Sequence, residues 1–230
     1  ADVNNDGYVD IVVGNYNKDN QVLINDGSGS FTASILPGGA LLTNDISTAD
    51  VNGDGHVDII VGNNGSNQVL INDGSGSFTA SVLPGGALIT NDITAADVNN
   101  DGHVDIIVGD YNQDNQVLIN DGSGSFTAST LPRASGNTET FSISAADVNE
   151  DGIVDLIVGY RDAENEVLIN DGSGSFTPSI LPGGAQNTYS VAPADVNGDG
   201  HMDIIVGNVN QDNQVLLNDG SGSFTASVLP

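Results

Sequence analysis

Short apolar runs alternate with polar, glycine-rich stretches along the whole chain, and this alternation repeats five times. In the second copy the runs are DISTAD (45–50), VDIIVG (57–62), QVLIN (68–72) and SFTASVL (77–83). None has the i, i+3, i+4, i+7 apolar spacing of an amphipathic helix over a useful length. The pattern therefore predicts an all-β fold with four strands per copy, named A, B, C and D in chain order.

The connections between these strands are rich in turn residues. NDGSGS, between C and D, supplies the asparagine, aspartate and glycines that adopt positive φ in hairpins. PGGALLTN, between D and the next A, opens with Pro-Gly-Gly, which should break any regular element. Strand D carries Pro178 where other copies have alanine, and a proline within a sheet belongs on an edge strand. We therefore expect D to be the outer strand and A the inner one.

Strand B is a continuous apolar run, as expected for a strand covered on both faces. Four antiparallel strands in a repeat of 47 to 50 residues are typical of a β-propeller blade between two other blades. We predict one domain of five four-stranded blades, at approximately residues 1–44, 45–91, 92–138, 139–188 and 189–230. Only Ala1 precedes the first acidic motif, which leaves three alternatives: blade one lacks its inner strand, the residues of that strand were trimmed, or a second chain completes the blade.

An acidic motif precedes strand B in every repeat. Its positions 1, 3, 5 and 9 are Asp, Asn, Asp and Asp in all five copies, and position 6 is glycine. Calcium binds six to eight oxygen ligands from carboxylates, amides, carbonyls and water. Position 7 varies, as expected where only the backbone carbonyl is used. The motif therefore predicts about one Ca2+ per repeat, five in total.

The predicted side-chain ligands are Asp2, Asn4, Asp6, Asp10, Asp50, Asn52, Asp54, Asp58, Asp97, Asn99, Asp101, Asp105, Asp147, Asn149, Asp151, Asp155, Asp195, Asn197, Asp199 and Asp203. The predicted carbonyl ligands are Tyr8, His56, His103, Ile153 and His201. An EF-hand is excluded because position 12 is valine and no helical pattern flanks the loop. The alternative is a solvated Asx-rich turn, but such a turn needs one or two of these residues and each loop holds four.

The overall charge agrees with a cation as partner. Thirty-one acidic residues and three basic ones give a formal charge of −28, which argues against nucleic acid and anionic membranes as partners. Cysteine is absent, so disulfides and thiolate metal sites are excluded. No apolar run is long enough to insert in a membrane, and no signal peptide is present. We expect an extracellular or cell-surface protein, of which this chain is a fragment.

At the motif residues the chain resembles the FG-GAP/VCBS-type repeat family, whose DVNGDG…DLVVG motif the five copies match closely. The resemblance covers nearly the whole chain. It implies a calcium-binding β-propeller like those of integrin α subunits, some fungal lectins and many secreted bacterial and algal proteins. The Phe-Gly and Gly-Ala-Pro elements of the family name are not evident, and such propellers often have seven blades.

Loops between antiparallel strands alternate between the two ends of a blade. The acidic loops and the C–D turns should share one end, the motif face, and the B–C loops and D–A linkers the other, the variable face. The B–C loops are NYNKDN, NNGSN, DYNQDN, YRDAEN and NVNQDN, and one linker, RASGNTETF from Arg133, departs fully from the repeat. Candidate ligand-binding residues on the variable face are Tyr16, Tyr111, Tyr160 and Arg161.

Tyrosine beside planar polar groups suits a glycan or a peptide, although surface loops also vary without any function. Catalysis is not expected, because the acids outside the repeated pattern (Glu139, Glu150, Glu164 and Glu166) form no evident acid–base pair. Two hypotheses remain. The chain is a calcium-stabilised module that recognises carbohydrate or protein, or it is a purely structural repeat with no ligand beyond calcium.

Overall fold

The computed structural model describes residues 1–136 and 138–229, and within them every regular element is a β-strand. The first repeat contains β1 (Ile11–Val13), β2 (Tyr16–Lys18), β3 (Gln21–Asn25) and β4 (Phe31–Ile35). The second and third contain β5 (Leu41–Ala49), β6 (Asp58–Asn72), β7 (Phe78–Ala96), β8 (Asp105–Asp110), β9 (Gln116–Asn120) and β10 (Phe126–Thr130). The fourth contains β11 (Thr140–Ala146), β12 (Asp155–Tyr160), β13 (Glu166–Asn170) and β14 (Phe176–Ile180). The fifth contains β15 (Thr188–Ala194), β16 (Asp203–Asn208), β17 (Gln214–Asn218) and β18 (Phe224–Val228).

The last two repeats form separate antiparallel sheets of four strands, in the order β11-β12-β13-β14 and β15-β16-β17-β18. This is the predicted A-B-C-D order. Pro178 lies on β14 opposite Leu168, at the edge of its sheet, so the prediction of D as the outer strand is confirmed. The strands β5, β7, β11 and β15, which carry the A segments, pack against one another in chain order.

The six strands of the second and third repeats are joined, together with β2 of the first repeat, into one seven-stranded sheet, which differs from the prediction. Strand β7 continues through Pro84-Gly85-Gly86, although Pro-Gly-Gly was expected to break it. Both glycines do adopt positive φ, but the residues after them pair with the B–C loop: Asn64 pairs with Ile89 and Ser66 with Ala87. The B–C loop NNGSN is one residue shorter than the other four, and its pairing with the linker supplies the backbone partners that keep the chain extended.

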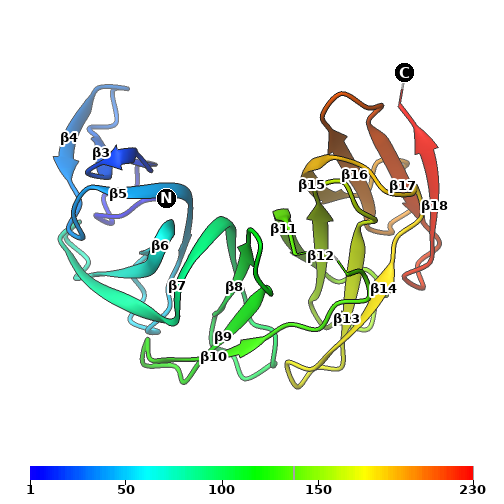
Figure 1. The fold of residues 1–230 in the computed structure, drawn as a ribbon. Coiled ribbons are helices and arrows are strands. Elements are labelled where there is room, and N and C mark those ends of the chain that lie inside the picture. Colours follow the sequence, from blue (N-terminus) through cyan, green and yellow to red (C-terminus); the bar gives the residue numbers. More distant parts are fainter. Residues whose placement is uncertain (137, 230) are drawn as a thin grey trace.

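The first repeat forms a three-stranded sheet, β1-β3-β4, and β2 pairs with β5 of the next repeat. The expected lack of an inner strand in blade one agrees with this sheet. Figure 1 shows the sheets following one another along an open arc, with the first and last repeats at its two ends. The architecture is therefore a series of propeller-type blades without a closed ring. No helix within residues 1–136 and 138–229 is long and apolar enough to cross a membrane.

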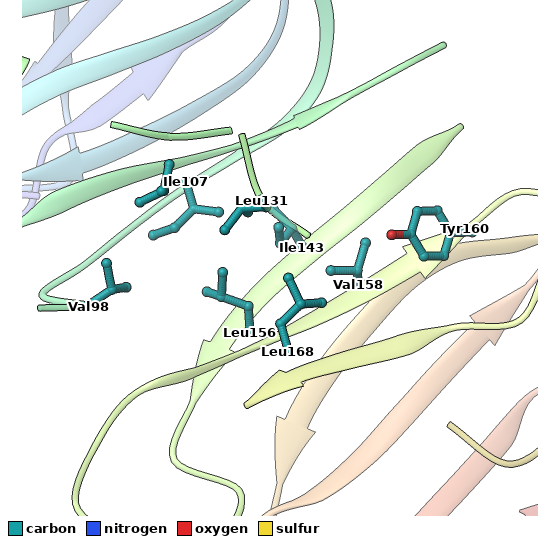
Figure 2. Packing of buried hydrophobic residues seen from close by; sticks show 9 residues of the cluster. Val98, Ile107, Leu131, Ile143, Leu156, Val158, Tyr160 and Leu168 are labelled. Carbon is teal, nitrogen blue, oxygen red and sulfur yellow. The ribbon is translucent and has the colours of Figure 1, made fainter. Parts of the chain in front are cut away.

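The hydrophobic core is divided among the gaps between successive blades. Figure 2 shows the gap between the third and fourth repeats, where Leu156 and Val158 of β12 pack with Ile107 of β8. The intervening residue, Ile157, packs in the next gap, with Ile204 of β16. All of these side chains are fully buried or nearly so, and each contributes about 1.5–3 kcal/mol to the hydrophobic stabilisation. Strand B is thus covered on both faces in the second, third and fourth repeats, as its apolar run predicts, whereas Ile11 and Ile205 in the first and last repeats are exposed.

Candidate functional site

Each acidic loop is a tight turn held by its own side chains. In the second repeat, Asp50 accepts hydrogen bonds from the backbone N–H groups of Gly53 (2.8 Å), Asp54 (3.2 Å) and Gly55 (2.8 Å). Asn52 accepts from the N–H of Asp54 at 3.1 Å and donates to its carboxylate at 2.9 Å. Glycine at position 6 has positive φ in all five copies, so the chain can fold back over positions 1, 3 and 5. The sequence spacing therefore does bring these oxygens into one small loop.

Two of the loops leave a carboxylate oxygen without a partner. Asp97 and Asp147, both at position 1, use Oδ2 to accept from the N–H of Gly102 (2.9 Å) and Gly152 (2.8 Å). Their Oδ1 atoms are buried and have no hydrogen-bond partner. A buried carboxylate oxygen is costly unless a donor or a cation faces it. These two atoms fit a bound cation, and the surrounding Asp and Asn oxygens are of the type that calcium prefers.

The position 9 carboxylates lie deeper, at the start of strand B. Asp58 is fully buried and accepts hydrogen bonds from the backbone N–H groups of Val51 (3.0 Å) and Asn72 (2.8 Å). Equivalent pairs hold Asp10, Asp105, Asp155 and Asp203. Burial raises the pKa of Asp58, Asp105 and Asp155, and the hydrogen bonds partly offset this rise. Position 9 thus links its loop to strand C through hydrogen bonds within the protein.

The described residues contain no group of three or more His, Cys, Asp or Glu side chains already arranged around a common point as a metal site. The predicted ligands of each repeat nevertheless lie in one loop and at the start of the strand that follows it. Calcium binding therefore stays a prediction, supported by the donor chemistry and the unpartnered oxygens of Asp97 and Asp147.

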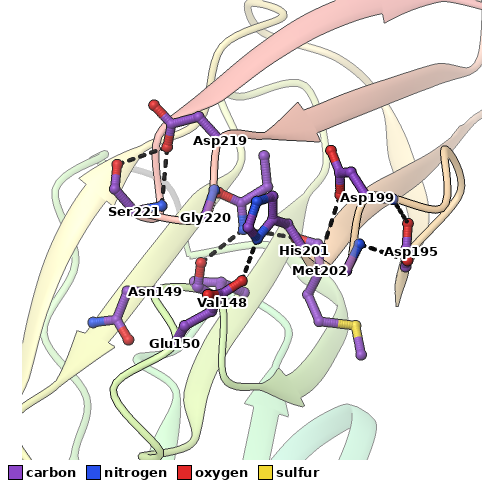
Figure 3. Close-up of polar contacts among 12 residues, drawn as sticks. Val148, Asn149, Glu150, Asp195, Asp199, His201, Met202, Asp219, Gly220 and Ser221 are labelled. Atoms are coloured by element: carbon purple, nitrogen blue, oxygen red, sulfur yellow. Dashed lines mark hydrogen bonds and ion pairs between the residues drawn. The ribbon is translucent and has the colours of Figure 1, made fainter.

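The residue at position 4 of the motif is constrained by the backbone conformation of the loop, which the sequence analysis did not predict. This residue has positive φ in all five loops, a conformation that favours glycine and asparagine and strains Glu150 (φ 61°). Glu150 contacts the imidazole of His201 in the next repeat, and this hydrogen bond raises the pKa of His201 (Figure 3). Asn5 makes the corresponding contact with His56, 2.7 Å between Nδ2 and Nδ1. At Asn5 and Glu150, position 4 therefore joins its loop to the loop of the next repeat.

Position 7 varies in sequence, yet its side chain has a defined place. The rings of Tyr8, His56, His103 and His201, and the side chain of Ile153, lie over the first glycine of the NDGSGS turn in their own repeat. A Cβ on that glycine, for example on Gly122 beneath His103, would collide with or crowd the side chain above it. The motif loop and the C–D turn therefore share one face, as predicted.

The asparagine that begins the C–D turn connects successive blades in the second to fifth repeats. Asn120 donates through Nδ2 to the carbonyl of Val104 in its own repeat (2.9 Å) and to that of Val51 in the preceding one (2.6 Å). The same pair of bonds recurs at Asn72, Asn170 and Asn218. The next residue, such as Asp121, accepts from Ser123 and forms an Asx turn that lowers its pKa. The motif face is therefore a row of identical inter-blade contacts.

The two segments that depart most from the repeat lie together on the variable face. Glu166 stands where other repeats have glutamine, and its buried carboxylate accepts from the backbone N–H groups of Ala134 and Ser135 in the divergent linker. Its glutamine counterpart Gln116 instead donates to the carbonyl of Gly85 at 3.2 Å. Glu166 is thus a structural residue, and the linker diverges with it because the donor and acceptor roles are exchanged.

The prediction of Tyr160 as a ligand-binding residue of the variable face is wrong. Its side chain is only 2% exposed because the ring belongs to the core between the third and fourth repeats, with its hydroxyl 3.5 Å from Glu166 (Figure 2). Burial raises its pKa. Tyr16 is 65% exposed on β2, and Tyr111 is half-buried, with its hydroxyl accepting from Arg161 at 3.4 Å. Tyr16, Tyr111 and Arg161 therefore remain on the variable face and Tyr160 does not.

Two aromatic residues near Tyr111 were missed by the sequence analysis. Phe141 packs edge-to-face on Tyr111 (ring centroids 6.0 Å apart) and stacks on Tyr189 (4.6 Å). An alignment of the repeats could have identified them, because Phe141 and Tyr189 stand at the strand A position that Asn44 and Asn91 occupy in the second and third repeats. Those asparagines donate to the neighbouring blade, at 2.8 Å to the carbonyls of Thr90 and Thr140, respectively.

Two carboxylates, those of the buried Asp110 and the half-buried Asp92, have pKa values above the ordinary value. Asp110 accepts from the Thr90 hydroxyl (2.9 Å) through Oδ1, while its buried Oδ2 has no partner, and burial raises its pKa to about 6. Burial, together with the neighbouring charge of Asp45, raises the pKa of Asp92 to about 6. Asp110 occupies the place of Asn63, whose amide donates to the carbonyl of Ser66 at 2.9 Å. Asp110 therefore lacks the donor with which Asn63 completes the same hydrogen-bond pattern.

Solved structures share this fold at low sequence identity. A lectin from Agrocybe aegerita, solved for its recognition of non-reducing terminal N-acetylglucosamine, aligns with a TM-score of 0.70 and 23% identity over 99% of this chain and 64% of its own. BBS1N in complex with ARL6DN aligns at 0.59 and 14% identity, over 95% of this chain and 63% of its own. The V. cholerae biofilm matrix protein Bap1 aligns at 0.55 and 17% identity, over 97% of this chain and 37% of its own. This chain therefore spans less than two thirds of each of these structures.

No curated protein sequence matches the chain significantly. The family model of the FG-GAP-like repeat matches it five times, at residues 2–61, 50–108, 97–158, 147–206 and 195–229. These matches run from the first acidic motif to the last strand. The chain therefore belongs to the FG-GAP-like repeat family.

Proposed function

We propose that this chain is a calcium-stabilised extracellular module of the β-propeller type that recognises carbohydrate or protein through its variable face. The observation that carries the proposal is the division between the two faces: the loops of one face keep nearly the same sequence in every blade, and the B–C loops of the other face differ in sequence in every blade. The fold shared with the Agrocybe aegerita lectin supports a recognition role. The function that we propose is therefore binding and not catalysis.

Calcium would be held in each repeat by the side-chain oxygens of positions 1, 3, 5 and 9 and by the carbonyl of position 7. In the third repeat these residues are Asp97, Asn99, Asp101, Asp105 and His103. Bound calcium supplies positive charge to a loop with three carboxylates, and five ions would bring the formal charge from −28 to −18. Extracellular modules bind calcium with dissociation constants of about 10⁻⁴ to 10⁻³ M, which suits the proposed location outside the cell.

The stabilisation expected from calcium is large for a protein. At ten times its dissociation constant, an ion adds about 1.4 kcal/mol per site, so five sites give about 7 kcal/mol. The whole free energy of unfolding of a domain is about 5–15 kcal/mol. We therefore expect the melting temperature to rise by about 15 °C or more when EDTA is replaced by millimolar calcium, measured by circular dichroism. Magnesium at the same concentration should have little effect.

A pair of variants separates a calcium site from a general charge effect. Asp97→Asn weakens one proposed site, and Asp121→Asn removes the same charge from the C–D turn of the same repeat. We expect Asp97→Asn alone to reduce the calcium-dependent rise in melting temperature. Equal behaviour of the two variants, or no calcium-dependent rise in the parent protein, would exclude these loops as calcium sites.

Recognition is tested separately, by applying the calcium-loaded protein to a glycan array and to extracellular protein extracts. Binding that is lost when B–C loop residues are changed supports the recognition module. Silence in both assays favours the second candidate function, a purely structural repeat. The observation in favour of that candidate is the near-identity of the repeats, as in the INDGSGSFTAS copies. Completion of the three-stranded first sheet by a second chain also stays a prediction, which analytical ultracentrifugation checks.

A further inference from the structure

The variable face has a hollow between the second and third repeats. It is lined by residues 64–65 of the shortened B–C loop, residues 87–89 of the D–A linker and residues 111–113 of the next B–C loop, and its volume is about 200 Å³. The unusual pairing of Gly65 with Leu88 and of Asn64 with Ile89 builds one side. Tyr111 is fixed beside it because its backbone N–H donates to the carbonyl of Ile89 at 2.7 Å. The hollow thus follows from the shortened loop.

Tyr111 gives this hollow an aromatic wall that is already held in place. The edge-to-face contact with Phe141 fixes one side of its ring, and the hydrogen bond from Arg161 fixes its hydroxyl. Phe141 is in turn stacked on Tyr189. A side chain held by packing and a hydrogen bond has less rotamer freedom to lose on binding, so it favours affinity.

The chemistry of the lining selects a class of ligand. Asn64, Asn112 and Gln113 offer neutral amides, which can both donate and accept, while Ile89 and Tyr111 offer apolar surface. None of the described residues that line the hollow carries a charged side chain, and the net charge of −28 opposes anionic ligands. An apolar ring face with neutral hydroxyls around it matches this lining. A volume of about 200 Å³ lies below the 300–1,000 Å³ of pockets for drug-sized ligands, so it suits a single sugar ring.

We propose that the hollow between residues 64–65, 87–89 and 111–113 binds one neutral pyranose unit, with Tyr111 stacked on the ring and the amides of Asn64, Asn112 and Gln113 bonding its hydroxyls. This inference rests on the proposed recognition function and names its site and ligand class. The equivalent Tyr16 belongs to the first B–C loop and is exposed, but it does not line the hollow beside it. Tyr16 is therefore the matched control.

The test uses the full chain, labelled with nitrogen-15 and loaded with calcium. It is titrated with glucose, galactose, mannose, N-acetylglucosamine and N-acetylgalactosamine while amide shifts are followed by NMR. We expect saturable shifts centred on residues 111–113 for at least one sugar. Tyr111→Ala should weaken that binding at least 10-fold, and Tyr16→Ala should leave it within 2-fold of the parent.

Folding of each variant is checked by its melting temperature. Gln113→Ala changes an exposed side chain and provides a second variant if Tyr111→Ala does not fold; a loss of 3-fold or more is expected. The proposal is overturned if no sugar binds, if the shifts map to other residues, or if Tyr111→Ala and Gln113→Ala bind like the parent. A positive glycan array that is insensitive to both variants would exclude this site and leave the recognition function standing.

Discussion

The two faces of the molecule differ in how uniformly the contacts between neighbouring blades repeat. On the motif face, Asn72, Asn120, Asn170 and Asn218 make the same contact with the preceding blade four times. On the variable face the contact between a blade and the preceding linker is the same at Gln68, Gln116 and Gln214, but it changes at Glu166. Gln116 donates to a linker carbonyl, whereas Glu166 accepts from linker N–H groups. Because the motif face already fixes the spacing of the blades, the opposite loops are free to change.

The ends of the arc show how much each blade depends on its neighbour. Valine at motif position 2 is fully buried or nearly so in the first four repeats, at Val3, Val51, Val98 and Val148, but Val196 in the last is 45% exposed. Likewise Asn25 in the first repeat reaches only the carbonyl of Val9 in its own loop, at 3.1 Å. The same residue type is therefore buried or exposed according to whether a following or preceding blade covers it.

The largest effect on stability is expected at the asparagine clamp, the pair of hydrogen bonds by which an asparagine such as Asn120 joins its own blade to the preceding one. Asn120→Ala removes two donated bonds and the acceptor of the Gly122 and Gly124 N–H groups, and it leaves buried backbone groups unpaired. We expect a loss of about 2–4 kcal/mol in the free energy of unfolding, measured by urea denaturation. Asn25→Ala, which has no preceding blade, should cost less than half as much. Equal losses would show that the clamp acts within a blade and does not join blades.

A smaller and more local effect is expected at Glu166. Glu166→Gln places an amide against the linker N–H groups, so one donor loses its acceptor, at a cost of about 1–3 kcal/mol. The chain has only three basic residues, so trypsin cleavage after Arg133 reports directly on the linker. We expect faster cleavage there in the variant, with cleavage after Lys18 unchanged. An unchanged rate after Arg133 would mean that Glu166 does not hold the linker.

The smallest effect is expected at Asp110, where substitution should increase the stability of the protein and not decrease it. Its folded pKa of about 6 lies above the ordinary 3.8, so the folded state holds its proton more tightly and loses stability as the pH rises from about 4 to above 6. Asp110→Asn restores the amide found at Asn63 and should stabilise the protein by about 1–2 kcal/mol at pH 8. That gain should shrink below pH 5, as denaturation at several pH values would show.

The reverse substitution, Asn63→Asp, tests whether stability depends on the repeated amide hydrogen bond and not on Asp110 alone. Asn63→Asp should destabilise the protein at pH 8, because its carboxylate would face the carbonyl of Ser66. If Asn63→Asp and Asp110→Asn shift stability in the same direction, the hydrogen-bond pattern does not explain the pKa of Asp110.

The sequence by itself determined the strands, their order and the grouping of the motif residues. These features are encoded in the residue pattern of one repeat: the two-sided apolar run of β12, the edge position of Pro178 and the glycines of the turns. Local spacing also placed positions 1, 3 and 5 of each acidic loop together. The repetition of the motif was therefore sufficient to predict the all-β class and the candidate calcium loops.

Only the tertiary structure decided what happens between repeats. It showed that Tyr160 is buried, that β7 passes through Pro84-Gly85-Gly86, that Glu166 holds a distant linker and that Tyr111 walls a hollow. Each of these outcomes depends on a partner about 20 to 50 residues away, and no periodicity within a repeat encodes such a partner. Local pattern fixes which face of a strand is apolar, whereas the neighbouring blade fixes which side chains remain accessible to a ligand.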